Sequence, residues 1–264
     1  MLRRWGLFGD QMLEQVTVRL LEPDEQERCR YGELMRRHHY LKGDTLVGEQ
    51  LRYVAEVDDQ WVALLSWSAA AYHLRDREEW IGWNAQQRRR RLALVVNNAR
   101  FLILPKVDCP NLASRVLALC TARLSADWQQ AYDHPVLAVE SFVDSQLFRG
   151  TCYKAQGWQL LGQTKGFERS RQDYYTEHER PKQLWVRELH PEARRLLCAA
   201  RLPAALQAAT ASPSANQPQA GTFPLRTVPA GDTASAPVRY RRHRRQKQPL
   251  PNRATQPALG KCRG

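Results

Sequence analysis

The sequence predicts an α/β (α+β) protein in which helices flank one mixed sheet, followed by a disordered, basic tail. Apolar and polar residues alternate over several short runs, as they do in half-buried strands. Residues 110–124 instead place apolar side chains at helical spacing, and this helix is preceded and followed by a strand. Two strands joined by such a crossover are parallel if they share a sheet.

The first expected helix begins at Pro23 and ends near His39. Proline is favoured in the first helical turn, and Asp24 and Glu25 place negative charges at the positive end of the helix dipole. Gly43 follows the helix end, where glycine is common because it adopts left-handed backbone angles readily. We therefore expect residues 1–49 to form a helical N-terminal segment.

A β-hairpin is expected next. Residues 51–57 alternate in polarity, residues 61–68 are strongly apolar, and Asp58 and Asp59 between them suit a turn. After the hairpin, Asn84 is a helix-capping residue for a short helix that runs to Arg91.

The centre of the sheet is expected to contain residues 99–104 and 136–142 as strands, joined by the helix that starts at Pro110. A second helix follows at residues 146–155, and Gly157 fits its end. The pattern then predicts two more strands and a last helix, which span residues 158–164, 183–189 and 192–206.

Composition divides the chain into four parts, with boundaries at 1–49, 50–190, 191–207 and 208–264. The whole chain has 40 Lys and Arg against 27 Asp and Glu, a net charge of +13, and residues 208–264 account for +9 of it and for eight of the 15 prolines. Such a segment cannot bury enough apolar surface to fold. We expect it to bind polyanions electrostatically through a run of basic residues, or else to act only as a solubilising tail. The basic residues singled out there are Arg241, Arg242, Arg244, Arg245 and Lys247.

Several classes of protein are excluded. No apolar run approaches the ~18–20 residues of a membrane span, so we expect no membrane partner. Residues 1–13 lack the unbroken apolar segment of a signal peptide. The six cysteines are scattered singly, without zinc-ligand spacing, which favours a reduced, cytoplasmic chain and predicts no zinc site.

Four residues near the end of the second central strand are candidate catalytic groups. Glu140 and Asp144 flank that end, where ligands bind in open parallel sheets, and two carboxylates there can hold a divalent metal or share acid and base roles. Arg149 and Tyr153 follow one helical turn apart, suited to clamping a phosphate and donating a proton. Asp144 can equally cap the next helix, Arg149 can pair with either carboxylate, and Tyr153 can simply bury its ring.

Polar residues beside the first central strand are candidates for substrate binding. Asn97 and Asn98 interrupt an apolar segment, which is costly unless their amides are hydrogen-bonded, and Arg100 follows them. They can bind a base or another polar substrate, or close a turn. His39 ends the first helix, where its charge is favourable and where it can also serve as a base.

Arg88, Arg89, Arg90 and Arg91 form a run that cannot be buried as a whole. Such a run is usually a solvated helix face, but tryptophans nearby make it resemble a basic patch with stacking aromatic residues, as in nucleic-acid-binding proteins. We assign it as a candidate nucleic-acid contact.

Two family resemblances follow from these residues. Tyr153 and the Gly157-Trp158 ending of its helix resemble the GNAT acyltransferases, in which a glycine-rich turn holds the pyrophosphate of acyl-CoA and a tyrosine can protonate the thiolate leaving group. A longer resemblance, over residues 50–189, is to the Druantia anti-phage protein A family, which also occurs in insertion-sequence contexts. The segments that carry the longer resemblance are 80–83 (WIGW), 94–105 (LVVNNARFLILP), 110–115 (PNLASR), 140–144 (ESFVD) and 148–153 (FRGTCY).

The longer resemblance implies a GNAT-like core and a role in anti-phage defence or in a mobile element, with nucleic acid, DNA more than RNA, and defence or transposase proteins as partners. Acetyl-CoA is not expected as a cofactor, because residues 107–114 contain no glycine, Pro110 lacks an N–H and Asp108 would repel an anion. The alternatives are an acyltransferase and a non-catalytic module that recruits partner proteins. Neither the residues nor the resemblance identifies a reaction.

Overall fold

The computed structural model describes residues 9–43, 45–105, 107–164, 167–171, 174–177, 180–204 and 206. All of them belong to the first of two compact units, Met1–Gln219. The expected basic tail, with Arg241, Arg242, Arg244, Arg245 and Lys247, lies outside the described residues. No described helix is long and apolar enough to cross a membrane.

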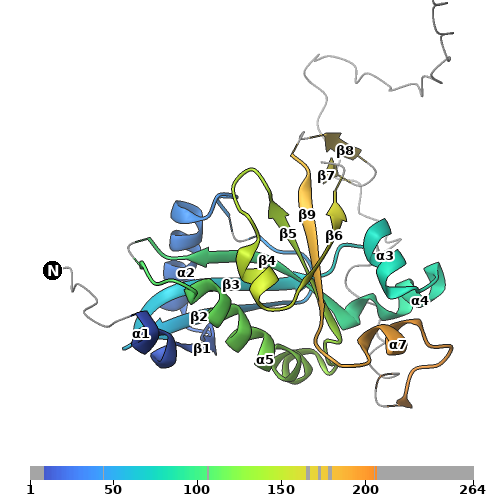
Figure 1. The fold of residues 1–264 in the computed structure, drawn as a ribbon, viewed down its shortest axis with the longest axis horizontal. Helices are drawn as coiled ribbons and strands as arrows, with labels where there is room; N and C mark the ends of the chain where they lie inside the picture. Colours follow the sequence, from blue (N-terminus) through green and yellow to red (C-terminus); the bar gives the residue numbers. More distant parts are fainter. Residues whose placement is uncertain are drawn as a thin grey trace, which may run out of the picture. The chain divides into compact units, whose positions relative to one another are not determined.

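A seven-stranded mixed sheet, in the order β1-β2-β3-β4-β5-β9-β6, forms the centre of the fold (Figure 1). β4 and β5 are parallel, and the other neighbouring strands of this sheet are antiparallel. β7 and β8 form a separate two-stranded ribbon. The strands are β1 (Thr17–Leu20), β2 (Gln50–Val57), β3 (Gln60–Ala69), β4 (Val95–Ile103), β5 (Ala138–Asp144), β6 (Gln159–Gln163), β7 (Phe167–Arg171), β8 (Tyr174–Glu177) and β9 (Lys182–Glu188).

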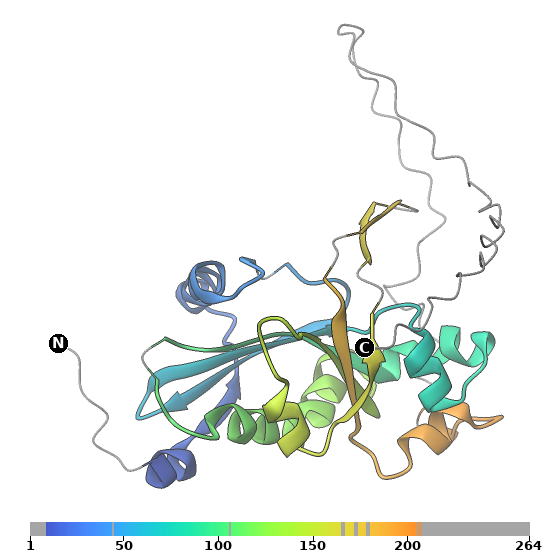
Figure 2. The same cartoon turned by 45° about the horizontal axis from the view of Figure 1, so that its top comes forward.

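Helices cover both faces of this sheet (Figure 2). The α-helices are α1 (Gly9–Gln15), α2 (Glu25–His38), α3 (Arg75–Ile81), α4 (Ala85–Arg91), α5 (Leu112–Tyr132), α6 (Thr151–Ala155) and α7 (Ala193–Cys198), and a 3-10 helix spans Leu92–Leu94. Leu117 and Leu124 of α5 pack with Trp67 of β3 on one face, and Met35 of α2 packs with Leu64 on the other.

The expected hairpin and the first two expected helices are confirmed. The Asp24 side chain accepts a hydrogen bond from the N–H of Glu27 at the start of α2, at 2.9 Å. Asn84 begins α4 with a complete capping box, in which its side chain accepts from the N–H of Gln87 and its own N–H donates to the Gln87 side chain. Local capping chemistry of this kind can be read from sequence because it needs only neighbouring residues.

Three expected boundaries are wrong, and the first of them is set by a contact that is not local. The first central strand begins at Val95 rather than residue 99, since Val95 pairs with Ala138 of β5. The helix expected from residue 146 begins only at Thr151, because residues 145–147 form a turn at the end of β5. The last helix spans Ala193–Cys198 instead of residues 192–206.

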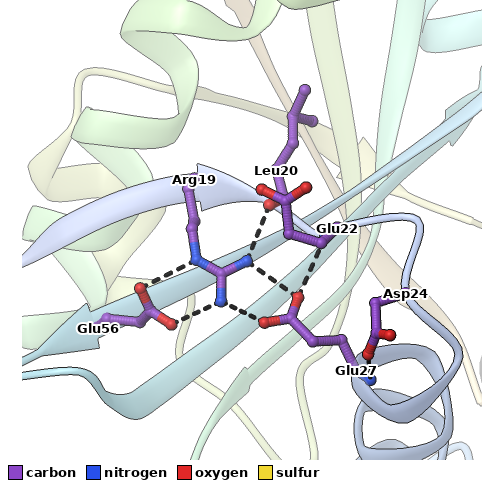
Figure 3. A network of polar contacts seen from close by, with 6 residues as sticks. All are labelled: Arg19, Leu20, Glu22, Asp24, Glu27 and Glu56. Atoms are coloured by element: carbon purple, nitrogen blue, oxygen red, sulfur yellow. Dashed lines mark hydrogen bonds and ion pairs between the residues drawn. The ribbon is translucent and has the colours of Figure 1, made fainter.

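Elements that the sequence analysis did not predict complete the N-terminal edge of the sheet. α1 precedes β1, and β1 pairs antiparallel with β2. Arg19 of β1 donates to Glu56 of β2 and to Glu27 of α2, with Nε–Oε2 and Nη1–Oε2 distances of 3.0 Å (Figure 3). The hydrogen bond from Arg19 holds the pKa of the Glu27 carboxyl below its usual value, so the network joins α2 to the sheet by charge-assisted contacts.

A buried histidine makes the stability of this fold depend on pH. His134 precedes β5, is 4% exposed, and its Nε2 lies 2.9 Å from Oε2 of Glu49, which precedes β2. Burial disfavours the imidazolium, but the hydrogen bond and the charge of Glu49 outweigh it and raise the pKa of His134 above its ordinary value. The pair therefore stabilises the fold fully below the ordinary histidine pKa of about 6.5, and the gain is lost as pH rises through the folded-state pKa.

We expect the free energy of unfolding of the wild type to exceed that of His134→Gln most at about pH 6, and the difference to shrink towards about pH 9. Urea unfolding of both proteins across this range measures the difference, and taking it between the two proteins cancels the titration of other groups. A constant difference would contradict the pairing with Glu49.

Candidate functional site

The parallel strands at the centre of the sheet separate halfway along their length. β4 and β5 pair from Val95 with Ala138 to Asn98 with Ser141, and no pairing continues beyond these residues although both strands run on. β4 continues with β3, and β5 continues with β9, so the two halves of the sheet diverge (Figure 1). The divergence opens a space between the carboxyl ends of two neighbouring parallel strands, the position at which open α/β sheets bind ligands.

A pocket of about 450 Å³ occupies this opening. Its walls come from the segment after α2, from β4, from the end of β5 and from the start of β9. The residues that line it are Tyr40, Leu41, Asn97, Asn98, Ala99, Arg100, Phe142, Asp144, Arg180 and Lys182.

Positive charge predominates around this pocket, where Arg100, Arg180 and Lys182 face one carboxylate, Asp144. Arg180 is half exposed and its Nη1 lies 3.9 Å from Oδ2 of Asp144, which leaves a long ion pair at the pocket edge. Asp144 is 1% exposed and accepts a hydrogen bond from the N–H of Gln146 at 3.0 Å. Its side chain therefore stabilises the turn after β5, and the alternative that it caps the following helix is wrong.

Arg100 has a positioning role in addition to its charge. Its guanidinium donates to the carbonyl of Ala99 in its own strand, at 2.8 Å, and to those of Gly43 and Thr45 at 2.9 and 3.4 Å. These bonds hold the segment between α2 and β2 against β4. The wall of the pocket that contains Tyr40 and Leu41 is fixed in this way.

His39 lies behind this wall, 4% exposed. Its Nδ1 accepts a hydrogen bond from the N–H of Leu41 at 3.2 Å. Burial, together with the positive charges of Arg100 and Lys182, lowers the pKa of His39 to about 4. The imidazole is therefore neutral near pH 7 and a poor proton acceptor there.

Two polar groups in the pocket have no partner among the described residues. The Asn97 Oδ1 atom is buried and accepts no hydrogen bond. The Lys182 ammonium group makes no hydrogen bond or ion pair within the described part of the chain. A buried acceptor without a partner costs free energy, so the pocket can gain from a ligand that donates to Asn97 and carries negative charge near Lys182.

The opposite side of the opening is closed by Tyr153. Its hydroxyl donates to Oδ1 of Asn98 at 2.7 Å and accepts from Oγ of Ser141 at 3.0 Å, which ties α6 to both β4 and β5. The ring lies against Trp158 and Trp185, with centroid distances of 4.9 and 6.3 Å. Burial raises the pKa of Tyr153, so its hydroxyl stays protonated and has its polar capacity satisfied by two neighbours.

The structure does not bring the four candidate catalytic residues together. Glu140 is fully buried on the face towards α3, where Oε2 lies 2.8 Å from Nη1 of Arg77 and Oε1 accepts from the N–H of Ala71 at 2.9 Å. Tyr153 lies on the opposite face, since Glu140 and Ser141 are successive strand residues. Arg149 is exposed in the loop before α6, so the expected one-turn spacing from Tyr153 within one helix is wrong. Asp144 alone of the four lines the pocket.

The four arginines of α4, Arg88–Arg91, have two different environments. Arg88 pairs with Glu78 at 2.8 Å, and Arg91 is 6% exposed and donates to the carbonyl of Leu197 at 2.8 Å. Arg89 and Arg90 are exposed. Half of the run thus holds α4 to α3 and α7, which leaves two arginines available at the surface.

Several site residues escaped the sequence analysis. Arg180 and Lys182 lie about 80 residues after Arg100 and join the pocket only because β9 pairs antiparallel with β5, with Lys182 opposite Asp144. Arg77, the buried partner of Glu140, stands in a run of charged residues that looks solvent-exposed. Among the pocket residues that the sequence analysis missed, Tyr40 had a local signal, because it directly follows the candidate residue His39.

The residues in front of α5 do not fit the acyl-CoA that a GNAT-like fold implies. The cap residue Asn111 has a left-handed backbone and makes no side-chain cap hydrogen bond, and the residues before it include Pro110, which has no N–H, and the exposed carboxylate of Asp108. No glycine allows a close backbone approach to a pyrophosphate there. Since the Tyr153 hydroxyl is also engaged, we derive no step through acyl-CoA. Among the described residues, no three His, Cys, Asp or Glu side chains come together as a metal-binding group.

Together, the crossover through α5, the single parallel pair and the strands that diverge beyond it define a GNAT-like α/β protein with a polar pocket at its centre. The family model described as Druantia protein DruA matches residues 10–195. This match covers more than half of the chain, and the protein belongs to the Druantia protein DruA family.

Three of the solved structures similar to this chain are acetyltransferases. Aminoglycoside 6'-acetyltransferase type Ii is 8% identical in sequence, and the two structures superpose with a TM-score of 0.43. The match covers 66% of this chain and 98% of that chain. NAA60 of Arabidopsis thaliana in complex with acetyl-CoA has 11% identity, coverage of 66% and 98%, and a TM-score of 0.43. RimL, a ribosomal L7/L12 alpha-N-protein acetyltransferase, has 10% identity, coverage of 67% and 94%, and a TM-score of 0.38. No curated protein of similar sequence was found.

Proposed function

We propose that this protein binds nucleic acid within an anti-phage defence system or a mobile element, and that the pocket between β4 and β5 holds a backbone phosphate. The observation that carries the proposal is the set of three cations, Arg100, Arg180 and Lys182, around a pocket with one carboxylate. The defence or mobile-element context is supported by membership of the Druantia protein DruA family.

The charge of the pocket favours an anion over a neutral ligand, and a phosphate is the anion that we propose. Lys182 presents an ammonium group without a partner in the described chain, and Arg180 brings a second donor group to the same edge. Partly buried cations keep most of their attraction for anions because water and salt screen them less. The net charge of +13 adds a long-range attraction for polyanions, which raises the rate of encounter.

Removal of one pocket charge is expected to weaken nucleic-acid binding and to make it less sensitive to salt. For Lys182→Gln and for Arg180→Gln we expect a loss of affinity of about three- to tenfold, and a salt slope lower by roughly one, because each phosphate contact releases about one counterion. Fluorescence anisotropy of a labelled DNA duplex and a single strand, over a series of salt concentrations, measures both quantities.

Arg201→Gln is the matched control, because Arg201 is exposed and does not line the pocket. It removes the same charge from the protein and should change affinity much less. If the pocket variants bind as Arg201→Gln does, the phosphate site is refuted. Calorimetry with acetyl-CoA separates the acyltransferase alternative, which requires micromolar binding at a loop that contains no glycine.

A further inference from the structure

We propose that the pocket receives an unpaired nucleotide, whose phosphate lies near Lys182 and Arg180 and whose base stacks on an aromatic rim formed by Tyr40 and Phe148. This inference rests on the proposed function, and adds to it a preference for single-stranded or extruded nucleotides over an intact duplex.

The rim is built by the turn that follows β5. The N–H groups of Leu147 and Phe148 donate to the carbonyl of Asp144, at 3.1 and 2.8 Å, and the Asp144 carboxylate accepts from Gln146. This turn leaves Phe148 half exposed, with its ring centroid 5.5 Å from that of Tyr40 in an edge-on arrangement. Tyr40 lines the pocket, so an exposed aromatic face lies directly beside the cationic opening.

The half-exposed ring of Phe148 packs edge-on against Tyr40 and is not part of the hydrophobic core of the described residues. Large apolar side chains that remain exposed on a folded protein are candidates for contact with a ligand when they adjoin a pocket. Base–aromatic stacking binds single strands with little dependence on sequence, since every base has a π-face. In a duplex the bases are stacked on each other and cannot cover the Phe148 ring.

The interior of the pocket also suits a nucleotide. Its volume of about 450 Å³ lies within the range of small-molecule sites. Asn97 lines the pocket, and a rotation of its side chain would present the partnerless Oδ1, which is buried in this structure, to a base amine or a sugar hydroxyl, while Lys182 attracts the phosphate. In a duplex the base amines are hydrogen-bonded to the opposite strand. An unpaired nucleotide is therefore the form that can both donate to Asn97 and place its phosphate near Lys182.

The test compares Phe148→Ala with Leu147→Ala, which removes a similarly exposed side chain from the preceding position of the same turn. Anisotropy titrations use the full chain with a labelled single strand of about 16 nucleotides and with a duplex of the same sequence. Phe148→Ala is expected to weaken single-strand binding on the order of tenfold and duplex binding less than twofold. Leu147→Ala should leave both unchanged.

Equal losses on the single strand and on the duplex, or no loss on either, would overturn the inference and leave the phosphate site intact. Failure of Lys182→Gln to weaken binding to any nucleic acid refutes the proposed phosphate site itself, which is a different outcome. Because Phe148 is half exposed, Phe148→Ala should melt within about 2 °C of the wild type, and a larger drop identifies a structural role instead. Asn97→Ser then provides a second variant, expected to weaken single-strand binding alone.

Discussion

Replacement of Glu140 by glutamine is expected to lower the free energy of unfolding by about 3–5 kcal/mol, because it leaves the buried guanidinium of Arg77 without a counter-charge. Both side chains are 0% exposed, and Nη1 of Arg77 lies 2.8 Å from Oε2 of Glu140. A second bond, from the N–H of Ala71, fixes the segment between β3 and α3 to β5. The pair thus connects β5 to α3 and to the segment that precedes α3.

Urea unfolding monitored by circular dichroism measures this loss, and a fall in melting temperature of roughly 10 °C should accompany it. Glu79→Gln is the matched control, since Glu79 forms an exposed ion pair with Arg75 in the same helix and its removal should not change stability measurably. The double variant Arg77→Met with Glu140→Leu should recover much of the stability, because an apolar pair of similar volume needs no counter-charge. A Glu140→Gln protein as stable as the wild type would show that the pair is not a structural requirement.

Substitution of Gly150 by alanine is expected to destabilise the fold by about 2–5 kcal/mol. Gly150 precedes α6 with a φ of +68°, in the left-handed region that an L-residue adopts only at a cost of ~1–2 kcal/mol. A Cβ atom there would lie 2.8 Å from Cζ2 of Trp185, an indole that is 5% exposed and packs against Tyr153. Displacement of that ring adds the cost of overpacking a core, typically about 1–3 kcal/mol.

Gly157→Ala separates the two costs. Gly157 follows α6 with a φ of +72°, and no atom lies within 4 Å of the position that a Cβ would take. It therefore carries the backbone cost alone, and thermal unfolding should place it clearly between the wild type and Gly150→Ala. If the two variants are equally stable, Trp185 is free to move and does not fix α6.

The two glycines show what could be predicted near the site. The position of Gly157 after a helix is a local signal, and the sequence analysis used it to end that helix. The requirement for Gly150 depends on Trp185, which is brought to it by the pairing of β9 with β5. The sequence analysis therefore extended the helix through Gly150. As a result it placed Arg149 in that helix, although Arg149 lies in the exposed loop before it.

The amino-acid sequence by itself determined the features of this protein that depend on neighbouring residues. It specified the hairpin through alternation, the starts of α2 and α4 through Asp24 and Asn84, and the parallel crossover through the order of strand, helix and strand. Capping bonds, turns and amphipathic faces form within a few residues, so these elements can be inferred from a single chain.

Only the tertiary structure decided the roles of the polar residues. The sequence makes Glu140 a candidate catalytic group, but in the fold it forms a buried ion pair with Arg77, and Lys182 joins the pocket because β9 returns to pair with β5. Asn97 and Asn98 are adjacent in sequence and both line the pocket, yet the side-chain oxygen of Asn97 has no partner among the described residues and that of Asn98 accepts a hydrogen bond from Tyr153. Burial and pairing across long sequence separations set the free energy of a charged or polar group, and neither is encoded in the spacing of residues along the chain.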